Sequence, residues 1–237
     1  MKMNKLATIY KYDNEESFFK RAANIFVTLI TDSIKKREQA FVALSGGTTP
    51  IPVFKIIRDE FVDKVNWNKV SFFWVDERSV PPNHSDSNFG NARNKLLDYL
   101  PGIRTYRIKG EHPAKKAAKE YEECIEKVVP SSDGLPCFDL IWLGMGTDGH
   151  TASIFPQSTV INEQEKWVKD VWVNKHDTHR VTLTFPVINN ARSRMIVIRG
   201  DSKLAIFKEI QQLEEKKYPI QYIYPSDADD YWIVGKK

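Results

Sequence analysis

Apolar residues in this chain change repeatedly between helical spacing and short continuous runs, and this alternation is the strongest constraint on its fold. Between Phe18 and Ile30 they recur at steps of three and four, which places them on one face of a helix that ends in the charged segment 35–39. A continuous apolar run, Phe41 to Leu44, follows at once and is typical of a buried strand. Alternation of this kind predicts βαβ units with parallel strands.

The same pattern continues to the end of the chain. Further helices are expected after Pro50 and over 88–100, 114–129 and 202–213, with Ser202 as the cap of the last. Strands are expected over 70–75, 138–143, 167–173, 181–185, 195–198, 220–224 and 231–234, and the proline-broken stretch 76–88 is expected to be a loop. We therefore predict a single α/β domain over residues 1–237, a three-layer α/β/α sandwich with a Rossmann-like, mostly parallel sheet and helices on both faces; two lobes are the alternative.

Charge and composition argue against several classes of function. The 35 Lys and Arg are interleaved with 31 Asp and Glu, which favours a small anionic substrate over nucleic acid. Cys124 and Cys137 belong to no CxxC or Cys/His grouping, so neither a zinc site nor a disulfide framework is indicated. No apolar run resembles a signal peptide or approaches the ~20 residues that cross a bilayer, so we expect a cytoplasmic protein without a membrane segment.

Three unusual segments follow predicted strands, where the ligands of a parallel sheet gather. The first is the glycine-rich stretch Ser45, Gly46, Gly47, Thr48, Thr49. Its backbone N–H groups, hydroxyls and following helix suit an anion such as phosphate, although a strand-to-helix turn with capping hydroxyls has the same composition. It lacks the Walker lysine and the GxGxxG pattern, so no nucleotide cofactor is indicated.

The other two segments carry charged side chains. In 75–78 a buried strand runs into three charges, and Arg78 there can pair with a phosphate or carboxylate, although a solvated loop has the same composition. Segment 143–156 holds Asp148 and His150 among glycines and hydroxyls; such an imidazole can act as a general acid or base, with the carboxylate fixing its tautomer. Ser87 and Asn88 are candidate helix caps, and the other histidines, at 84, 112, 176 and 179, are expected on the surface.

These segments together resemble a known family. SGGTTP at 45–50, VDER at 75–78 followed by SN at 87–88, and GMGTDGHTASIFP at 144–156 are similar to the signature set of the 6-phosphogluconolactonases, in the larger group that includes the glucosamine-6-phosphate deaminases. The resemblance extends through 179–191 and 199–203. It implies a deaminase/ribose-5-phosphate isomerase-like fold and the hydrolysis of 6-phospho-D-glucono-1,5-lactone to 6-phosphogluconate in the oxidative pentose phosphate pathway, without a metal or cofactor.

The resemblance also implies the residues of the site. The phosphate is expected to bind the glycine loop and basic side chains, namely Ser45, Gly46, Gly47, Thr48, Thr49, Arg78, Arg180 and Lys203. His150 is expected to act on the attacking water or the leaving oxygen, oriented by Asp148, and Asp76 matches a carboxylate position shared with the deaminases.

Two other functions fit parts of the pattern. A glucosamine-6-phosphate deaminase or isomerase resembles the same motifs, but those relatives have a glutamate where Phe155 stands and usually an aromatic residue where Arg78 stands. A non-catalytic sugar-phosphate sensor would keep the binding loops, and the presence of Asp148 and His150 argues against it. The expected partner is a small phosphorylated sugar lactone, and the expected oligomeric state is a monomer or weak homodimer.

Overall fold

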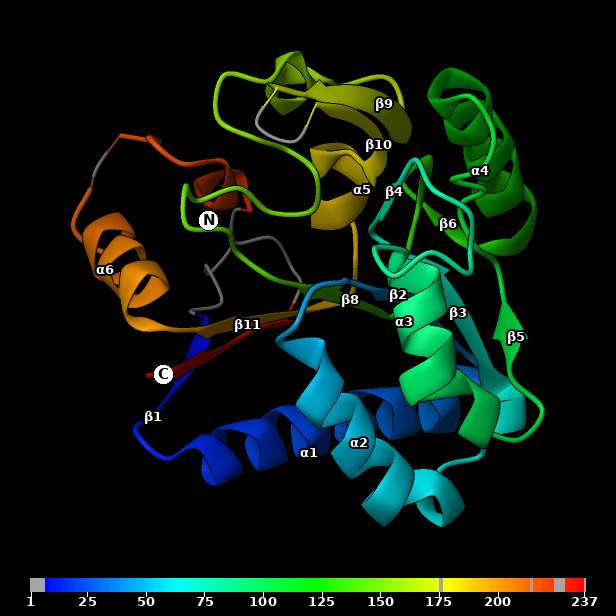
Figure 1. The fold of residues 1–237 in the computed structure, drawn as a ribbon. Coiled ribbons are helices and arrows are strands. Elements are labelled where there is room, and N and C mark those ends of the chain that lie inside the picture. The colour runs from blue at the N-terminus through cyan, green and yellow to red at the C-terminus, as the bar shows by residue number, and fades with distance from the viewer. Residues whose placement is uncertain (1–6, 175–176, 214, 224–228, 237) are drawn as a thin grey trace.

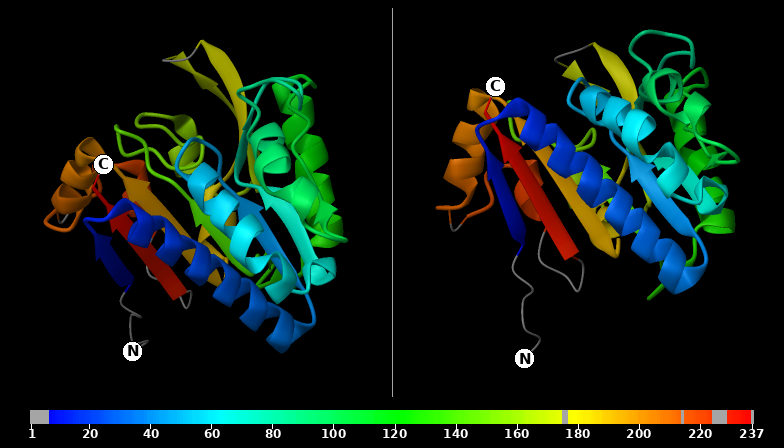
Figure 2. Two further views of the ribbon diagram at one scale, coloured as in Figure 1. Left: turned by 60° about the horizontal axis from the view of Figure 1, so that its bottom comes forward. Right: turned by 90° about the horizontal axis from the view of Figure 1, so that it is seen from below.

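A parallel seven-stranded sheet forms the centre of the protein (Figures 1 and 2). The computed structural model describes residues 7–174, 177–213, 215–223 and 229–236. The strand order is β1-β12-β11-β8-β2-β3-β5, and each neighbouring pair is parallel. The strands are β1 (Thr8–Tyr12), β2 (Ala40–Leu44), β3 (Val70–Trp74), β5 (Arg104–Thr105), β8 (Leu140–Leu143), β11 (Ser193–Arg199) and β12 (Asp229–Gly235). The predicted parallel sheet is confirmed, and β1 adds an edge strand that the sequence pattern did not indicate.

Helices cover both faces of this sheet, as predicted. In Figure 1, α1 (Glu15–Arg37) and α2 (Pro50–Phe61) lie on one face, and α5 (Phe185–Asn189) and α6 (Asp201–Ile210) lie on the other. On the α1–α2 side, the buried ring of Trp142 in β8 packs between Phe26 of α1 and Phe54 of α2, with ring centroids 5.4 and 5.5 Å away. The helical spacing of apolar residues between Phe18 and Ile30 therefore corresponds to the buried face of α1.

The remaining helices lie beside this core. They are α3 (Asn88–Lys95), which contacts α2, and α4 (Ala114–Val128), together with short 3-10 turns at Val62–Lys64, Trp67–Lys69, Leu97–Tyr99, Thr159–Asn162 and Pro219–Tyr222. The predicted helix over 88–100 is thus an α-helix followed by a 3-10 turn. None of the described helices combines the length and the apolar character needed to cross a bilayer.

A second sheet, of three antiparallel strands, contacts α4. It consists of β4 (Asp76–Arg78), β10 (Thr178–Leu183) and β9 (Val168–Val173), and a two-stranded ribbon pairs β6 (Ser131–Ser132) with β7 (Leu135–Pro136). The expectation that 76–88 is entirely loop is therefore wrong, because its first residues pair with β10. This pairing sets Arg78 opposite Arg180 and Asp76 opposite Thr182.

Three further local expectations are wrong. The predicted strand 220–224 begins as a 3-10 helix, because Pro219 opens a turn in which the side-chain oxygen of Gln221 accepts the backbone N–H groups of residues 217 and 218; residue 224 lies outside the described residues. The predicted strand 181–185 ends at Leu183, and Phe185 begins α5. Ser202 is not a cap, since α6 begins at Asp201 after Gly200, whose φ of 111° suits glycine.

Candidate active site

The predicted site residues meet where the order of the central sheet reverses. From β2 the chain proceeds through β3 and β5 toward one edge, whereas β8, β11 and β12 lie on the other side of β2. The loops that follow β2 and β8 therefore diverge and leave a crevice at the carboxyl ends of these strands, the usual ligand position in such sheets. A cavity of about 330 Å³ lies there.

The cavity collects almost the whole predicted set. It is lined by Ser45, Gly46, Gly47, Thr48, Thr49, Asp76, Arg78, His150, Arg180 and Lys203, and also by Asn88, Trp142, Met145, Thr151 and Val197, among others. Asp148 does not line it but contacts His150. The predicted residues alone come from five separate parts of the chain, and the convergence of strand ends brings them to one pocket.

The loop after β2 is shaped for close approach by a ligand. Gly47 has a φ of 89°, in the left-handed region that favours glycine. Thr49 occupies the N-cap position of α2 and Pro50 its first turn, yet the Thr49 side chain makes no capping hydrogen bond. Capping therefore does not explain the hydroxyl of Thr49, and α2 presents its N-terminus to the cavity with an electrostatic preference for anions.

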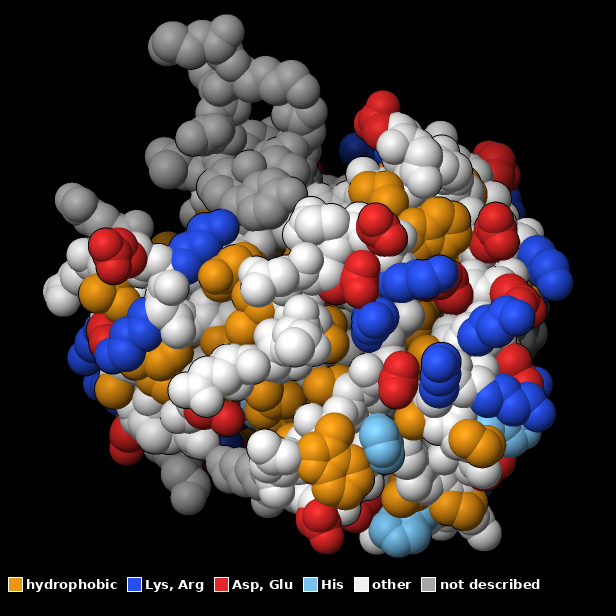
Figure 3. All heavy atoms as spheres, turned by 90° about the horizontal axis from the view of Figure 1, so that it is seen from above, with side chains coloured by type: hydrophobic (Ala, Val, Ile, Leu, Met, Phe, Trp, Pro, Cys, Tyr) orange, Lys and Arg blue, Asp and Glu red, His pale blue; other side chains and the backbone are white. Residues whose placement is uncertain are grey.

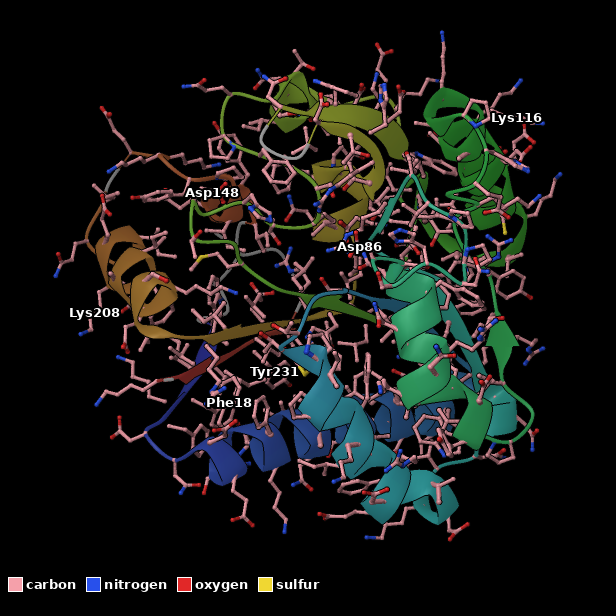
Figure 4. The ribbon with its side chains drawn as sticks, in the orientation of Figure 1. Phe18, Asp86, Lys116, Asp148, Lys208 and Tyr231 are labelled. Atoms are coloured by element: carbon pink, nitrogen blue, oxygen red, sulfur yellow. The ribbon has the colours of Figure 1, made fainter. Side chains whose placement is uncertain are left out.

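His150 and Asp148 form a direct pair on the loop after β8, on which Figure 4 labels Asp148. Nδ1 of His150 lies 2.5 Å from Oδ1 of Asp148. This hydrogen bond is the main reason why the pKa of Asp148 lies well below its usual range. Because the carboxylate is ionised and accepts, Nδ1 carries the proton in the neutral ring, and Nε2 keeps its lone pair.

The backbone of this loop permits the pair to form. The N–H of Gly146 donates to the carbonyl of His150 at 2.8 Å, which closes the turn. Gly149 has a φ of 75° and lies against the ring of Tyr218, where a side chain would collide. The glycines that distinguished this segment in the sequence are thus required by its geometry.

Asp76 is the centre of a buried hydrogen-bond network. Its Oδ2 accepts from Oγ of Ser153 at 2.5 Å, and its Oδ1 and backbone carbonyl accept from the amide of Asn88 at 3.2 and 2.8 Å. A guanidinium nitrogen of Arg180 lies 4.0 Å from Oδ2. Asp76 therefore fixes the positions of its neighbours in the pocket wall.

Glu77, which sequence reasoning did not select, anchors a second part of the wall. Its buried carboxylate accepts four hydrogen bonds at 2.7 to 3.0 Å, from the backbone N–H groups of Arg78, Asn88 and Phe89 and from Oγ of Ser87. Burial raises the pKa of Glu77, and these hydrogen bonds oppose that rise. Ser87 caps α3 by accepting the N–H of Gly90 at 3.0 Å, as predicted.

Positive charge enters the pocket from two directions. The guanidinium of Arg180 lies 5.6 Å from the centre of the Phe155 ring, and that ring in turn lies 4.2 Å from the imidazole of His150. Burial lowers the pKa of Arg180 and of Lys203, the latter in the first turn of α6. The Arg78 guanidinium donates to the backbone carbonyl of Asp86, which Figure 4 labels.

The other histidines do not reach the pocket. His84 and His179 are exposed, His112 is half-buried beside Glu120, and His176 lies outside the described residues. On the face drawn in Figure 3, basic and acidic side chains are interleaved, without a continuous basic stripe. The sheet and its helices define an α/β fold. The basic side chains at the cavity, with a histidine–aspartate pair beside it, define an enzyme site for a small anionic ligand.

Comparisons with known proteins identify the family. Residues 13–232 match the family described as glucosamine-6-phosphate isomerases/6-phosphogluconolactonase, and the chain belongs to it. It is 34% identical over 225 residues to 6-phosphogluconolactonase of Chlamydia pneumoniae, covering 92% of this chain and 84% of that protein. It is 40% identical over 221 residues to 6-phosphogluconolactonase of Treponema pallidum, covering 90% of each. The solved 6-phosphogluconolactonase of Trypanosoma brucei superposes with a TM-score of 0.89 and 26% identity, covering 97% of this chain and 96% of that one. The predicted family and fold are confirmed.

Proposed function

We propose that this chain hydrolyses 6-phospho-D-glucono-1,5-lactone to 6-phosphogluconate in the oxidative pentose phosphate pathway, and is thus a carboxylic ester hydrolase. The observation that carries the proposal is that His150, held by Asp148, lines the same cavity as the anion-binding loop at the start of α2. Bacterial relatives named 6-phosphogluconolactonase, similar over most of their length, support it.

The phosphate of the substrate binds the segment from Ser45 to Thr49, at the positive end of α2. Arg78, Arg180 and Lys203 line the same cavity and add positive charge. Attachment of the phosphate, which does not react, orients the lactone carbonyl toward His150 and converts binding energy into positioning.

The reaction requires one proton acceptor that later becomes a donor. Nε2 of His150 removes a proton from water as the water oxygen bonds to C1 of the lactone. The C1–O5 bond of the tetrahedral intermediate then breaks, and Nε2 returns the proton to O5, which becomes a hydroxyl. The carboxylic acid product loses its proton to solvent. Asp148 holds the imidazole and stabilises its protonated form.

Phe155 favours the lactonase over the deaminase or isomerase. The ring of Phe155 packs on His150, so an apolar group lies beside the imidazole. The resemblance described above implies a glutamate at this position in the deaminases. Because Phe155 stands in place of that glutamate, this chain lacks the carboxylate that would relay a proton during ring opening of an amino sugar. A cytoplasmic location and a monomeric or weakly dimeric state complete the proposal.

Hydrolysis of freshly generated 6-phosphoglucono-1,5-lactone tests the proposal, measured against the spontaneous rate with glucosamine 6-phosphate assayed in parallel. The proposal predicts accelerated lactone opening and no release of ammonia. Ammonia release would assign the chain to the deaminases, and saturable binding of 6-phosphogluconate without turnover of either compound would identify a sensor.

A further inference from the structure

Unpaired polar atoms concentrate at the pocket. Among the described residues, five buried side-chain nitrogen or oxygen atoms have no hydrogen-bond partner, and three belong to residues that line the cavity. These three are Nε of Arg78, Nε of Arg180 and Oδ1 of Asn88. A buried polar group without a partner destabilises the folded state, so such groups call for a functional or structural reason.

Asn88 differs from the two arginines because its unpaired atom is an acceptor. Its amide nitrogen donates to two oxygens of Asp76, the backbone carbonyl at 2.8 Å and Oδ1 at 3.2 Å. Both neighbours accept hydrogen bonds, so the amide cannot be reversed without placing oxygen against oxygen. The orientation is therefore fixed, and Oδ1 must point away from Asp76.

The position of Oδ1 lies beside the anion-binding loop. A β-carbon at Gly46 would fall 1.7 Å from Oδ1, so the amide oxygen packs directly on the first glycine of that loop. Asn88 is 2% exposed and lines the cavity. Its rigid support comes from Asp76 and from Glu77, which binds the Asn88 backbone N–H at 2.7 Å. A preorganised acceptor thus stands at the edge of the phosphate cradle.

An acceptor at this place repels phosphate and carbonyl oxygens and selects a donor. The proposed lactone substrate carries donors only as the hydroxyls at C2, C3 and C4. We propose that Asn88 Oδ1 accepts a hydrogen bond from one of these hydroxyls, which makes Asn88 a specificity-determining residue for the ring. This inference rests on the proposed lactonase function.

The test combines Asn88→Leu with lactones that lack single hydroxyls. Wild type and variant are assayed on the parent lactone and on its 2-, 3- and 4-deoxy analogues, after circular dichroism has shown that both are folded. On the parent lactone, kcat/KM of the variant falls about tenfold to a hundredfold, because the amide oxygen that accepts the hydrogen bond from the hydroxyl is lost. On one deoxy analogue the difference between wild type and variant largely disappears, because the hydrogen-bonding group is already absent.

Ser153→Ala is the matched control, because it removes the other hydrogen bond to the Asp76 carboxylate and leaves Asn88 in place. Its fold loss is expected to be equal on all four substrates. An equal loss for Asn88→Leu on all four would overturn the inference and leave Asn88 as a support for Asp76 alone, while the lactonase function would stand. A wild type inactive on the parent lactone would overturn both. If Asn88→Leu does not fold, Asn88→Ser carries the same comparison.

Discussion

Gly146 and His150 lie in direct contact: a β-carbon at Gly146 would be 2.1 Å from Nδ1 of the His150 ring and 2.7 Å from Oδ1 of Asp148. The pair of His150 and Asp148 therefore exists in its present geometry only because residue 146 has no side chain. The glycine is part of the active-site geometry rather than a generic turn residue.

Gly146→Ala should consequently reduce kcat by about a hundredfold while the fold survives. The methyl group displaces the imidazole from Asp148, and a shift of about 1 Å at such a site costs on the order of a hundredfold in kcat. Steady-state hydrolysis and circular dichroism measure the two effects. Gly134→Ala is the control, because a β-carbon at Gly134 meets no atom within 4 Å; the positive φ of 79° at Gly134 strains an alanine, so this variant should lose stability alone. Full activity in Gly146→Ala would contradict the contact.

Asp148→Asn should reduce kcat far more than it affects binding. The amide no longer holds the proton on Nδ1 of His150, so the imidazole populates the wrong tautomer, a change worth up to about 10⁴-fold in a comparable histidine–aspartate pair. Affinity for 6-phosphogluconate, measured by calorimetry, should change little, since Asp148 does not line the cavity. A large loss of affinity with unchanged kcat would be the opposite of this expectation.

Glu77→Gln should destabilise the protein and impair binding together. Both carboxylate oxygens of Glu77 accept hydrogen bonds, two each. A side-chain NH₂ group at the Oε2 position can still donate to the Ser87 hydroxyl but faces the N–H of Phe89, so at least one bond is lost. An unpaired buried donor costs about 1–3 kcal/mol of the free energy of unfolding, measurable by urea denaturation. Because Arg78 and Asn88 are held by this carboxylate, KM should rise as well. Unchanged stability would show that the network is not needed.

Binding of 6-phosphogluconate should weaken as pH rises into the alkaline range, earlier than for an ordinary lysine. Burial lowers the pKa of Lys203, so its ammonium loses its proton, and the site its positive charge, at a lower pH than a surface lysine does. Lys203→Arg should keep affinity to higher pH, because a guanidinium stays protonated. Lys208→Arg, at an exposed position of the same helix, should behave as wild type. An identical pH profile for wild type and Lys203→Arg would exclude Lys203 from the phosphate site.

The sequence predicted the parts of this site that rely on local chemistry. The glycine loop, Arg78 and the pair of Asp148 and His150 stood out because each follows an apolar run, and parallel strands bring such loops to one edge. Sequence reasoning could not select Glu77 as an anchor, because three of its four hydrogen bonds come from residues at the start of α3, about ten positions later. A charge beside a strand looks the same whether it is solvated or buried.

The prediction of local structure was wrong where tertiary pairing or turn geometry competes with the preference of the local composition. The apolar segment beginning at Ile220 has a strand-like composition, but Pro219 and the Gln221 side chain turn it into a 3-10 helix. Asp76 was expected in a loop, yet pairing with β10 extends the chain there. The sequence indicates Asn88 as a candidate helix cap and as part of the family signature, but not its contact with Gly46, which links loops that the sequence places more than forty residues apart.

Hydrolysis of the lactone by His150→Ala tests the central claim most directly. Initial rates are measured on fresh 6-phosphoglucono-1,5-lactone, corrected for spontaneous opening, beside wild type and His179→Ala, which changes an exposed histidine outside the cavity. With His150 as the group that moves the proton, His150→Ala loses at least about a hundredfold in kcat and still binds 6-phosphogluconate, while His179→Ala matches wild type. Equal turnover by His150→Ala and wild type would contradict the account.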